Sequence, residues 1–534
     1  MIEKVYDYVI IGSGFGGSVS AMRLTEKGYS VLVLERGKRF EDKEFPKSNW
    51  NIWKYLWMPA IRAFGILQLS FFKRLFVFHS SGVGGGSLVY AGVLMEPDDT
   101  FFEANTWPYK DDWKTVLRPH YETARRMLGV ARNPKLTPAD MALKGVAEEL
   151  RFGKTFRPTE VGFFFGPEGE EVPDPYFEGE GPARSGCIHC GGCMVGCRYN
   201  AKNTLPKNYL YFAEKNGAVI WPEVTVKDVH QLSDDQPYEA RYEVIFHSST
   251  SLLKNDRSVR ARNVIVSAGT LGTNKLLLDC RDVKRSLPKL SSKLGQTVRS
   301  NSEAFLGSFV RNGQEDHSQG LAISSIFHAD EVTQIEPVRF SAGSSLIYWI
   351  IGSPLIKGGG NILRRLGQTL MAILKRPVEF FDMKFGLSWA KRGTAIMVMQ
   401  AEDNLMRLKL GRNLFTLFKR GLVPEHDPDH TIPIDIQLGH KVIHSYSKRI
   451  GGYPVGTLPE GLLTMPMTAH MLGGCLMGGT AESGVVDENF QVHNYPGLYV
   501  IDGSTVPANP GVNPTLTITA LAEYAMSKVE EKPK

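Results

Sequence analysis

The sequence predicts an α/β protein of two lobes, and three observations lead to that fold class. An apolar run at residues 8–11 leads directly into a glycine-rich turn close to the N-terminus. A second apolar run, residues 31–34, follows one helix later and ends at an acidic residue, and a third, residues 264–266, ends in small residues. Apolar strands that alternate with helices and end in glycine-rich turns are typical of a parallel, Rossmann-like sheet.

The first glycine-rich turn has the spacing Gly12-x-Gly14-x-x-Gly17, followed by a helical stretch at residues 18–27. In this motif the first glycine permits the tight turn, the second lets the backbone approach a pyrophosphate, and the third lets helix and strand pack closely. Glu35 ends the second strand, where an acid accepts hydrogen bonds from ribose hydroxyls and repels a 2′-phosphate. The sequence therefore predicts a dinucleotide site that disfavours NADP. A glycine-rich turn of an ordinary α/β protein is the alternative.

Composition excludes several classes of protein. The chain has 534 residues, 42% of them apolar and 22% charged, and a formal net charge of +6. We expect no nucleic-acid partner, because no Lys/Arg-rich run is present. No apolar stretch is long enough to span a membrane, and residues 346–356, the longest candidate, contain Gly and Pro. The N-terminus shows no signal peptide, so we expect a cytoplasmic protein.

The motifs divide the chain into two interleaved lobes. We assign the Rossmann-like lobe to residues 1–45, 80–115, 200–320 and 461–534. We assign residues 46–79, 116–199 and 321–460 to a smaller lobe and other insertions. We expect the smaller lobe to be built on an antiparallel sheet. No low-complexity linker separates the lobes, so we expect them to pack directly against each other.

The C-terminal region carries the densest motifs. His470 lies beside the glycine pair Gly473-Gly474, where small residues let a flat ligand approach the backbone and the imidazole. A strand over residues 497–501 ends at Asp502-Gly503, and Asn513-Pro514-Thr515 begins a helix. A strand end next to a helix start suits recognition of a cofactor's phosphate or ribityl chain through backbone N–H groups.

Together these segments resemble the glucose–methanol–choline (GMC) oxidoreductase family, in particular flavin-containing cholesterol oxidases of the actinobacterial type. The matching segments run from end to end of the chain, at residues 12–17, 82–88, 96–97, 268–272, 470–475 and 511–523. The resemblance implies a p-hydroxybenzoate-hydroxylase-like two-lobe fold, a Rossmann-like FAD-binding lobe with non-covalent FAD, and a smaller substrate lobe. It also implies oxidation of an apolar secondary alcohol, first of all a 3β-hydroxysteroid.

By the same resemblance, His470 is the base for the substrate hydroxyl and Asn513 positions substrate and flavin. Loss of hydride from a carbinol carbon builds positive charge, so removal of the hydroxyl proton by a histidine lowers the barrier. A hydrogen-bonded core histidine is the alternative for His470. The residues expected to contact FAD are Gly12, Ser13, Gly14, Phe15, Gly16, Gly17, Glu35, Gly84, Gly85, Gly86, Ser87, Val224, Ala268, Gly269, Asp502, Gly503, Asn513, Pro514 and Thr515.

Two other functions stay open. The substrate could be a long-chain or terpenoid alcohol whose electrons pass to an acceptor other than oxygen, or the protein could be a non-catalytic FAD electron-transfer subunit. The chain also departs from the family at Tyr90, where some cholesterol oxidases carry asparagine. Isomerising members use a glutamate in the substrate lobe, for which Glu402 is the nearest candidate, although a solvated strand end is the alternative for this residue.

A cysteine cluster precedes the second half of the chain. Cys187-x-x-Cys190-x-x-Cys193-x-x-x-Cys197 has the spacing of half a bacterial ferredoxin motif, without its proline. The cluster could hold an iron–sulfur centre, a zinc ion, or no metal at all. An iron–sulfur centre would let electrons leave a flavin one at a time.

Residues 46–79 and 345–376 both mix bulky apolar side chains with Lys and Arg. One interpretation is a surface that contacts a membrane peripherally, with the basic residues at anionic head groups. The other is a substrate lobe whose apolar residues are simply core.

Overall fold

The computed structural model describes residues 4–108, 112–233, 239–311, 313, 315–357, 360–386 and 388–533. Residues 1–3, on which the signal-peptide prediction rests in part, and residues 358–359 of the second basic, apolar stretch lie outside this description. The first sheet, here called the nucleotide sheet, has the strand order β12-β2-β1-β15-β14-β13, and β27 also pairs with β15. Its strands are β1 (Val5–Ile11), β2 (Val31–Leu34), β12 (Val219–Trp221), β13 (Val224–Gln231), β14 (Tyr242–Ser248), β15 (Arg257–Val266) and β27 (Leu498–Val500).

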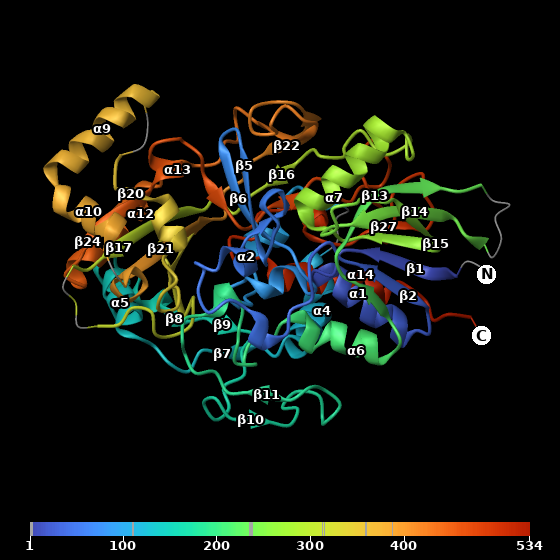
Figure 1. Ribbon diagram of the computed structural model, residues 1–534, viewed down its shortest axis with the longest axis horizontal. Coiled ribbons are helices and arrows are strands. Elements are labelled where there is room, and N and C mark those ends of the chain that lie inside the picture. Colours follow the sequence, from blue (N-terminus) through green and yellow to red (C-terminus); the bar gives the residue numbers. More distant parts are fainter. Residues whose placement is uncertain are drawn as a thin grey trace.

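The centre of the nucleotide sheet is parallel. β1 lies between β2 and β15, with Ile11 opposite Leu34 on one side and Val266 on the other. These strands are nearly continuous apolar runs, because helices and the other lobe bury both of their faces. α1 (Phe15–Glu26) packs on α14 (Thr515–Ser527) and α6 (Tyr209–Lys215), and α4 (Trp113–Met127) packs on α14. Both described chain ends lie at this side of the molecule (Figure 1).

The second sheet, here called the antiparallel sheet, has the order β20-β24-β17-β21-β19-β18-β8. Its strands are β8 (Arg157–Pro158), β17 (Ala304–Phe309), β18 (Ser325–His328), β19 (Thr333–Val338), β20 (Gly352–Pro354), β21 (Gly393–Gln400) and β24 (Tyr453–Thr457). All its neighbouring strands run antiparallel. The sheet lies on the opposite side of the molecule from the nucleotide sheet (Figure 1).

Alternation along β21 explains why both faces of the antiparallel sheet are buried. Ile396 and Val398 pack with Val442 under α12 (Gln437–Arg449) and α5 (Pro138–Glu149). Met397 and Met399 point to the other face and join a separate apolar cluster. This two-residue period is that of a pleated strand. The predicted fold class, an α/β protein with a Rossmann-like lobe and a second lobe on an antiparallel sheet, is confirmed. The residue boundaries of the two lobes stay a prediction.

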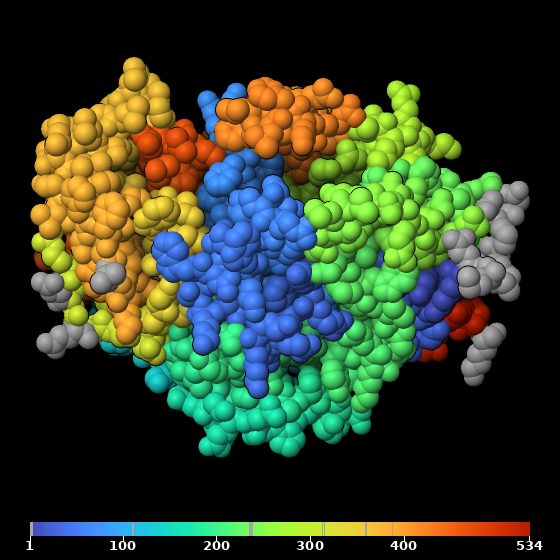
Figure 2. All heavy atoms as spheres, viewed as in Figure 1, coloured from blue at the N-terminus to red at the C-terminus, as the bar shows by residue number. Residues whose placement is uncertain are grey.

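Two smaller sheets lie between the large ones. One is the hairpin of β5 (Leu67–Phe72) and β6 (Leu75–Ser80), extended by β25 (Met467–Thr468); the other has the order β23-β22-β16-β26. The latter strands are β16 (Val298–Arg299), β22 (Met406–Gly411), β23 (Gly421–His426) and β26 (Leu472–Gly473). Residues 46–79 therefore contribute buried core residues and a strand next to the C-terminal motifs. Figure 2 shows this early part of the chain, in blue, in the centre of one face between the two large lobes.

The remaining elements are short or peripheral. They are α2 (Ile52–Tyr55), α3 (Asp99–Phe102), α7 (Gly269–Leu278), α8 (Leu346–Ile351), α9 (Ile362–Lys375), α10 (Pro377–Phe385), α11 (Trp389–Arg392), α13 (Leu458–Gly461), β3 (Trp57–Met58), β4 (Ala63–Phe64), β7 (Ala131–Arg132), β9 (Glu160–Val161), β10 (Glu171–Val172) and β11 (Arg184–Ser185). Within the described ranges, no helix is long and apolar enough to cross a bilayer.

Candidate active site

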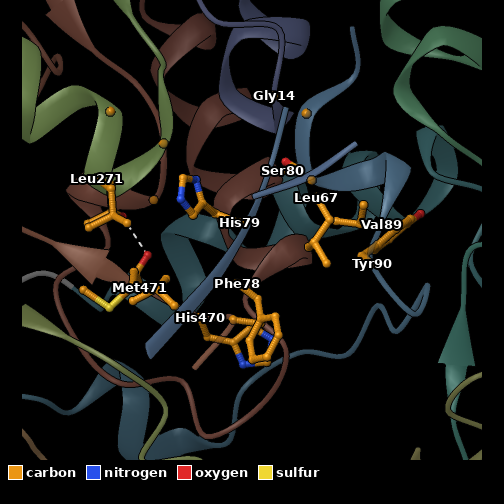
Figure 3. Close-up of a pocket in the computed structure, with 18 of the residues that line it drawn as sticks. Gly14, Leu67, Phe78, His79, Ser80, Val89, Tyr90, Leu271, His470 and Met471 are labelled. Atoms are coloured by element: carbon orange, nitrogen blue, oxygen red, sulfur yellow. Dashed lines mark hydrogen bonds between the residues drawn. The ribbon is translucent and has the colours of Figure 1, made fainter. Parts of the chain in front are cut away.

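One large cavity, of about 880 Å³, extends from the carboxyl ends of the parallel strands to the inner face of the antiparallel sheet. Most of the residues predicted for the site line it, namely Gly12, Ser13, Gly14, Phe15, Gly16, Glu35, Gly85, Gly86, Val224, Ala268, Gly269, His470, Asp502, Gly503, Asn513, Pro514 and Thr515. Gly17, Gly84 and Ser87 are not part of its wall. Figure 3 shows labelled wall residues from distant parts of the chain, among them Gly14, Tyr90 and His470.

The glycine-lined end of the cavity fits a dinucleotide. A Cβ atom at Gly16 would lie 1.9 Å from the Ile501 carbonyl oxygen, and one at Gly17 would lie 2.1 Å from the Gly12 carbonyl oxygen, so both glycines are needed for packing. A Cβ atom at Gly14 would meet no protein atom within 4 Å. Gly14 instead borders the cavity at the N-terminus of α1, where backbone N–H groups and the helix dipole attract phosphates. The N-termini of α7 and α14 border the same cavity.

Glu35 ties the two glycine-rich turns together. Its carboxylate accepts hydrogen bonds from the Ser13 backbone N–H (3.1 Å) and hydroxyl (2.7 Å), and from the backbone N–H groups of Gly37 (2.8 Å) and Gly82 (3.3 Å). The Ser13 hydroxyl also accepts a hydrogen bond from the Gly84 backbone N–H (3.1 Å). The sequence pointed to Glu35 as a ribose ligand only. The structure adds that this buried acid shapes both loops of the dinucleotide end.

The second glycine-rich turn lies directly against the first. Gly84 and Gly85 have φ angles of 103° and 51°, which favour glycine, and a Cβ atom at Gly85 would lie 2.6 Å from the Gly14 Cα. Tyr90 follows this turn in the cavity wall, edge-on to Phe15 and with the Lys202 ammonium 4.6 Å from its ring centre. Tyr90 therefore places an aromatic ring in the cavity wall directly after the second glycine-rich turn.

Asp502 lies at the end of β27 and is held by four donors. Its carboxylate accepts from the Gly269 backbone N–H (2.9 Å), the Thr273 hydroxyl (2.5 Å), and the Ser504 backbone N–H (2.8 Å) and hydroxyl (2.5 Å). Burial raises the pKa of Asp502, and these hydrogen bonds oppose the increase. Asp502 therefore fixes the start of α7 at the cavity as well as lining the wall.

His470 lies between β25 and β26, and a buried acid contacts its ring. The His470 Nδ1 atom is 2.8 Å from the Glu303 Oε1 atom, and the Glu303 side chain is fully buried. Glu303 Oε1 also accepts a hydrogen bond from the Ala469 backbone N–H (3.2 Å). The Asn301 Nδ2 atom lies 3.2 Å from the same ring nitrogen and donates to the Val512 carbonyl oxygen at 2.7 Å. No described residue hydrogen-bonds the His470 Nε2 atom, which remains available to a ligand in the cavity.

The acids that lie next to His470 and Asn513 were not identified from the sequence. Glu336 on β19 is fully buried, and neither of its carboxyl oxygens has a hydrogen-bond partner among the described residues. Burial raises the pKa of Glu336 to about 8, while the nearby Asn513 side chain has a smaller opposing effect. Burial also raises the pKa of Glu460 to about 8, although Glu460 accepts from the Phe305 backbone N–H and the Thr457 hydroxyl. No spacing motif marks these glutamates in the sequence.

These two protonated acids predict that stability falls as pH rises. Between the ordinary value of 4.5 and about pH 8, the unfolded chain loses the Glu336 proton and the folded protein retains it. The free energy of unfolding should therefore decrease by up to about 1.4 kcal/mol per pH unit for each such carboxyl. Thermal unfolding from pH 5 to pH 8 should show a shallower decrease for Glu336→Gln than for the parent. The exposed Glu331→Gln is the matched control, and an unchanged slope in Glu336→Gln would contradict the prediction.

The far end of the cavity is predominantly apolar. Its wall includes Leu67, Val77 and Phe78 from the β5–β6 hairpin, Phe305 and Met397 from the antiparallel sheet, and Phe340, Ile347, Tyr348, Ile351, Trp389 and Val455. His79 also lines the cavity, and burial together with the adjacent Arg36 lowers the pKa of His79 to about 3. Its Nε2 atom lies 2.8 Å from the Ser70 hydroxyl, so His79 is a neutral, hydrogen-bonded wall residue.

The structure bears on two questions that the sequence left open, the content of the cysteine cluster and the role of Glu402. Within the described ranges, no three His, Cys, Asp or Glu side chains form a group that could hold a metal ion. Cys187, Cys190, Cys193 and Cys197 form no disulfide bond, and burial raises the pKa of Cys193 to about 12. The structure therefore does not support an iron–sulfur or zinc site there. Glu402 is exposed and does not line the cavity, so it is not positioned to act on a bound substrate.

Comparison with known proteins agrees with this geometry. A family model described as GMC oxidoreductase matches residues 183–280 and another of the same description matches residues 462–522, while an NAD(P)-binding Rossmann-like domain matches residues 10–40. The chain is 44% identical to a cholesterol oxidase of Acinetobacter baumannii, over 99% of this chain and 95% of that protein. It is 43% identical to a cholesterol oxidase of Mycobacterium tuberculosis, over 98% of this chain and 90% of that protein.

More distant proteins share the fold. A long-chain-alcohol oxidase of Arabidopsis thaliana is 25% identical over 98% of this chain and 67% of its own length. The solved structure of pyridoxine 4-oxidase from Mesorbium loti superposes with a TM-score of 0.61 at 14% identity, covering 98% of this chain and 99% of that one. The resemblance predicted from the sequence motifs is confirmed.

Proposed function

Because this chain belongs to the GMC oxidoreductase family, and is thus an FAD-dependent alcohol oxidoreductase, we propose that it oxidises the hydroxyl group of a 3β-hydroxysterol to the ketone. One observation carries the proposal. A single cavity joins a glycine-lined dinucleotide end, the His470–Glu303 pair and an apolar chamber. Such a cavity holds a flat cofactor, a proton acceptor and an apolar substrate in contact with one another.

The residues at the dinucleotide end fit non-covalent FAD. Gly14 leaves space for the cofactor, and the N-termini of α1 and α14 supply backbone N–H groups that suit phosphates. The buried Glu35 supplies an acid at the position where the motif places a ribose. Bound FAD would supply the two-electron acceptor that takes the hydride from the carbinol carbon. The Asn513 Oδ1 atom has no hydrogen-bond partner among the described residues, so this oxygen is available to accept a hydrogen bond from substrate or cofactor.

His470 is the proposed base. We assign the ring proton to Nδ1, because the Glu303 carboxylate lies 2.8 Å away and accepts it. The Nε2 lone pair then faces the cavity and takes the proton from the substrate hydroxyl as the carbinol C–H bond breaks. The positive charge that develops on the imidazole is balanced by Glu303, whose side chain is fully buried. Glu303 therefore acts through His470 as a positioning residue.

Replacing Glu303 by glutamine tests this pairing. We expect kcat to fall by about tenfold to a thousandfold, because the amide no longer fixes the ring tautomer or balances the imidazolium. Glu303→Asp should recover part of the rate. A kcat of Glu303→Gln equal to that of the parent, or a rate loss that Glu303→Asp does not recover at all, would argue for a purely structural acid.

The lining of the chamber supports a sterol. Its wall is built from aromatic and aliphatic side chains, with His470 and Asn513 at the end nearest the dinucleotide. That arrangement suits a bulky apolar molecule with one hydroxyl group. The two most similar relatives described above are both cholesterol oxidases.

The first experiment is an anaerobic titration of the purified holoenzyme with a 3β-hydroxysterol in detergent. Loss of the flavin absorbance near about 450 nm supports the proposal, and its return in air supports oxygen as the acceptor. A flavin that dithionite reduces but the sterol does not would reject the sterol and favour a long-chain or terpenoid alcohol. Oxidation of the 3β-hydroxysterol only in the presence of an added dye as electron acceptor would favour a dehydrogenase.

A further inference from the structure

The helix α9 presents its apolar face to solvent and its polar face to the protein. Ile362, Leu363, Leu366, Leu370, Met371 and Leu374 are between 43% and 73% exposed. On the opposite side Arg365 is buried, and Gln368 and Thr369 are half-buried. A surface helix of a water-soluble domain normally has the reverse arrangement. Figure 1 shows α9 at the outer edge of the molecule, beyond the antiparallel sheet.

The exposed apolar surface continues beyond α9. On α10, Val378, Phe381 and Phe385 are 59% to 70% exposed at helical spacing. Lys384 of α10 donates to the Trp349 carbonyl oxygen (3.0 Å), which joins α10 to α8. Trp349 is 49% exposed and its ring lies 6.1 Å from that of Trp50, which is 48% exposed. We call these residues of α8, α9 and α10, together with Trp50, the apolar platform.

Charge at the rim of the apolar platform indicates which partner covers it. Arg364 and Lys375 are exposed on α9, where residues 361–375 include no Asp or Glu, while Arg376 pairs with Glu379 of α10 at 3.3 Å. An apolar face with Trp and Leu, flanked by Lys and Arg, is the composition of helices that lie in the head-group region of anionic bilayers. A second copy of the chain would bring the same cations to the contact and would be repelled.

We propose that the apolar platform docks the protein peripherally on an anionic phospholipid bilayer. The proposal also gives the platform a place in the reaction, and this part rests on the proposed sterol function. Ile347, Tyr348 and Ile351 of α8 line the cavity, while Trp349 and Ile350 of the same helix are exposed. One short helix therefore separates the docked bilayer from the substrate chamber, so an apolar alcohol could pass from lipid to cavity with little contact with water.

Vesicle binding tests the docking without any sterol. The holoenzyme is mixed with phosphatidylcholine vesicles, with or without phosphatidylglycerol, and bound protein is measured by flotation. We expect the parent to bind the anionic vesicles, and Leu370→Glu/Leu374→Glu to bind about tenfold more weakly or less. Leu252→Glu/Leu253→Glu adds the same charges at two leucines that are 81% and 77% exposed elsewhere, and it should bind like the parent.

Further measurements separate the alternatives. Arg364→Gln/Lys375→Gln should weaken binding to anionic vesicles and remove its salt dependence. Flavin absorbance and the thermal midpoint establish that each variant is folded. Equal binding by the parent and Leu370→Glu/Leu374→Glu, or no binding by the parent, would overturn the proposal. So would a parent dimer in sedimentation that this variant converts to a monomer, because a second copy would then cover the platform.

Activity assays keep this proposal distinct from the proposed function. With sterol in vesicles, Leu370→Glu/Leu374→Glu should lose kcat/KM about tenfold, and with sterol in detergent it should match the parent. If the parent oxidises no sterol in either form, the proposed function fails. Vesicle flotation then still decides whether the platform docks on lipid.

Discussion

Replacing His470 by alanine is expected to lower kcat for alcohol oxidation by about 10²–10⁴, while the protein keeps its flavin. The ring supplies the proton acceptor at Nε2, and Glu303 holds its Nδ1 side at 2.8 Å. Alanine removes both the acceptor and the charge that develops with the hydride loss. The measurement is anaerobic flavin reduction by the substrate in a stopped-flow instrument, with the flavin-to-protein ratio determined first.

A matched control is available on the surface. His430 is exposed and its ring lies 3.3 Å from the carboxylate of the nearby Asp427, so His430→Ala should leave both flavin content and reduction rate unchanged. Because His470→Ala would leave Glu303 buried without its partner, a decrease of a few degrees in the thermal midpoint is also expected. Reduction of the His470→Ala flavin at the parent rate would disprove the role of this residue.

Replacing Gly14 by alanine is expected to abolish retention of FAD while leaving the fold intact. A Cβ atom at this position meets no protein atom within 4 Å, so the substitution costs little in the protein itself. The methyl group would instead point into the glycine-lined end of the cavity, where the backbone must approach the pyrophosphate. We expect the FAD dissociation constant to rise at least about a hundredfold, measured by titration of the deflavinated protein.

Two other glycines sharpen this test. Gly367 on α9 also has open space around its Cβ position but lies away from the cavity, so Gly367→Ala should keep FAD. Gly16→Ala should fail to fold, because its methyl group would overlap the Ile501 carbonyl group. Parent-like FAD affinity in Gly14→Ala would show that the cofactor's phosphates bind elsewhere in the cavity.

The sequence alone allowed the fold class and the family to be predicted, because glycine motifs report backbone geometry directly. Gly12 and Gly85 have positive φ angles, and Gly16 packs against a carbonyl group, so their identity is fixed by local space. His470 could be identified as a candidate catalytic residue because a glycine pair follows it closely in the sequence. Where local geometry dictates residue type, a short motif is sufficient to predict structure.

The other half of the site could not be predicted from short motifs. Glu303, directly before β17, and Glu336, on β19, are 167 and 177 positions from His470 and Asn513. These two glutamates belong to the site only because tertiary packing brings them there. No local pattern in the sequence distinguishes them from other glutamates. The cysteine cluster shows the converse, since its spacing is compatible with a metal site, yet within the described residues no group of side chains is placed to hold a metal ion and Cys187 and Cys193 are buried. The inverted polarity of α9 was visible only once the structure showed which face the protein covers.

The pairing of β6 with β25 bears on any attempt to change which alcohols the enzyme accepts. Phe76 and Val77 lie opposite Met467 and Thr468, and the Thr468 hydroxyl accepts a hydrogen bond from the His470 backbone N–H at 3.0 Å. Substitutions in the β5–β6 hairpin that reshape the chamber would therefore also move His470. We expect kcat to fall together with the affinity for the substrate. On the opposite wall, β21 is linked to His470 through Asn301, whose carbonyl oxygen accepts a hydrogen bond from the Gln400 backbone N–H at 3.0 Å. Among the described hydrogen bonds β24 has no direct link to His470, so its wall residue Val455 is the better starting point for altering selectivity.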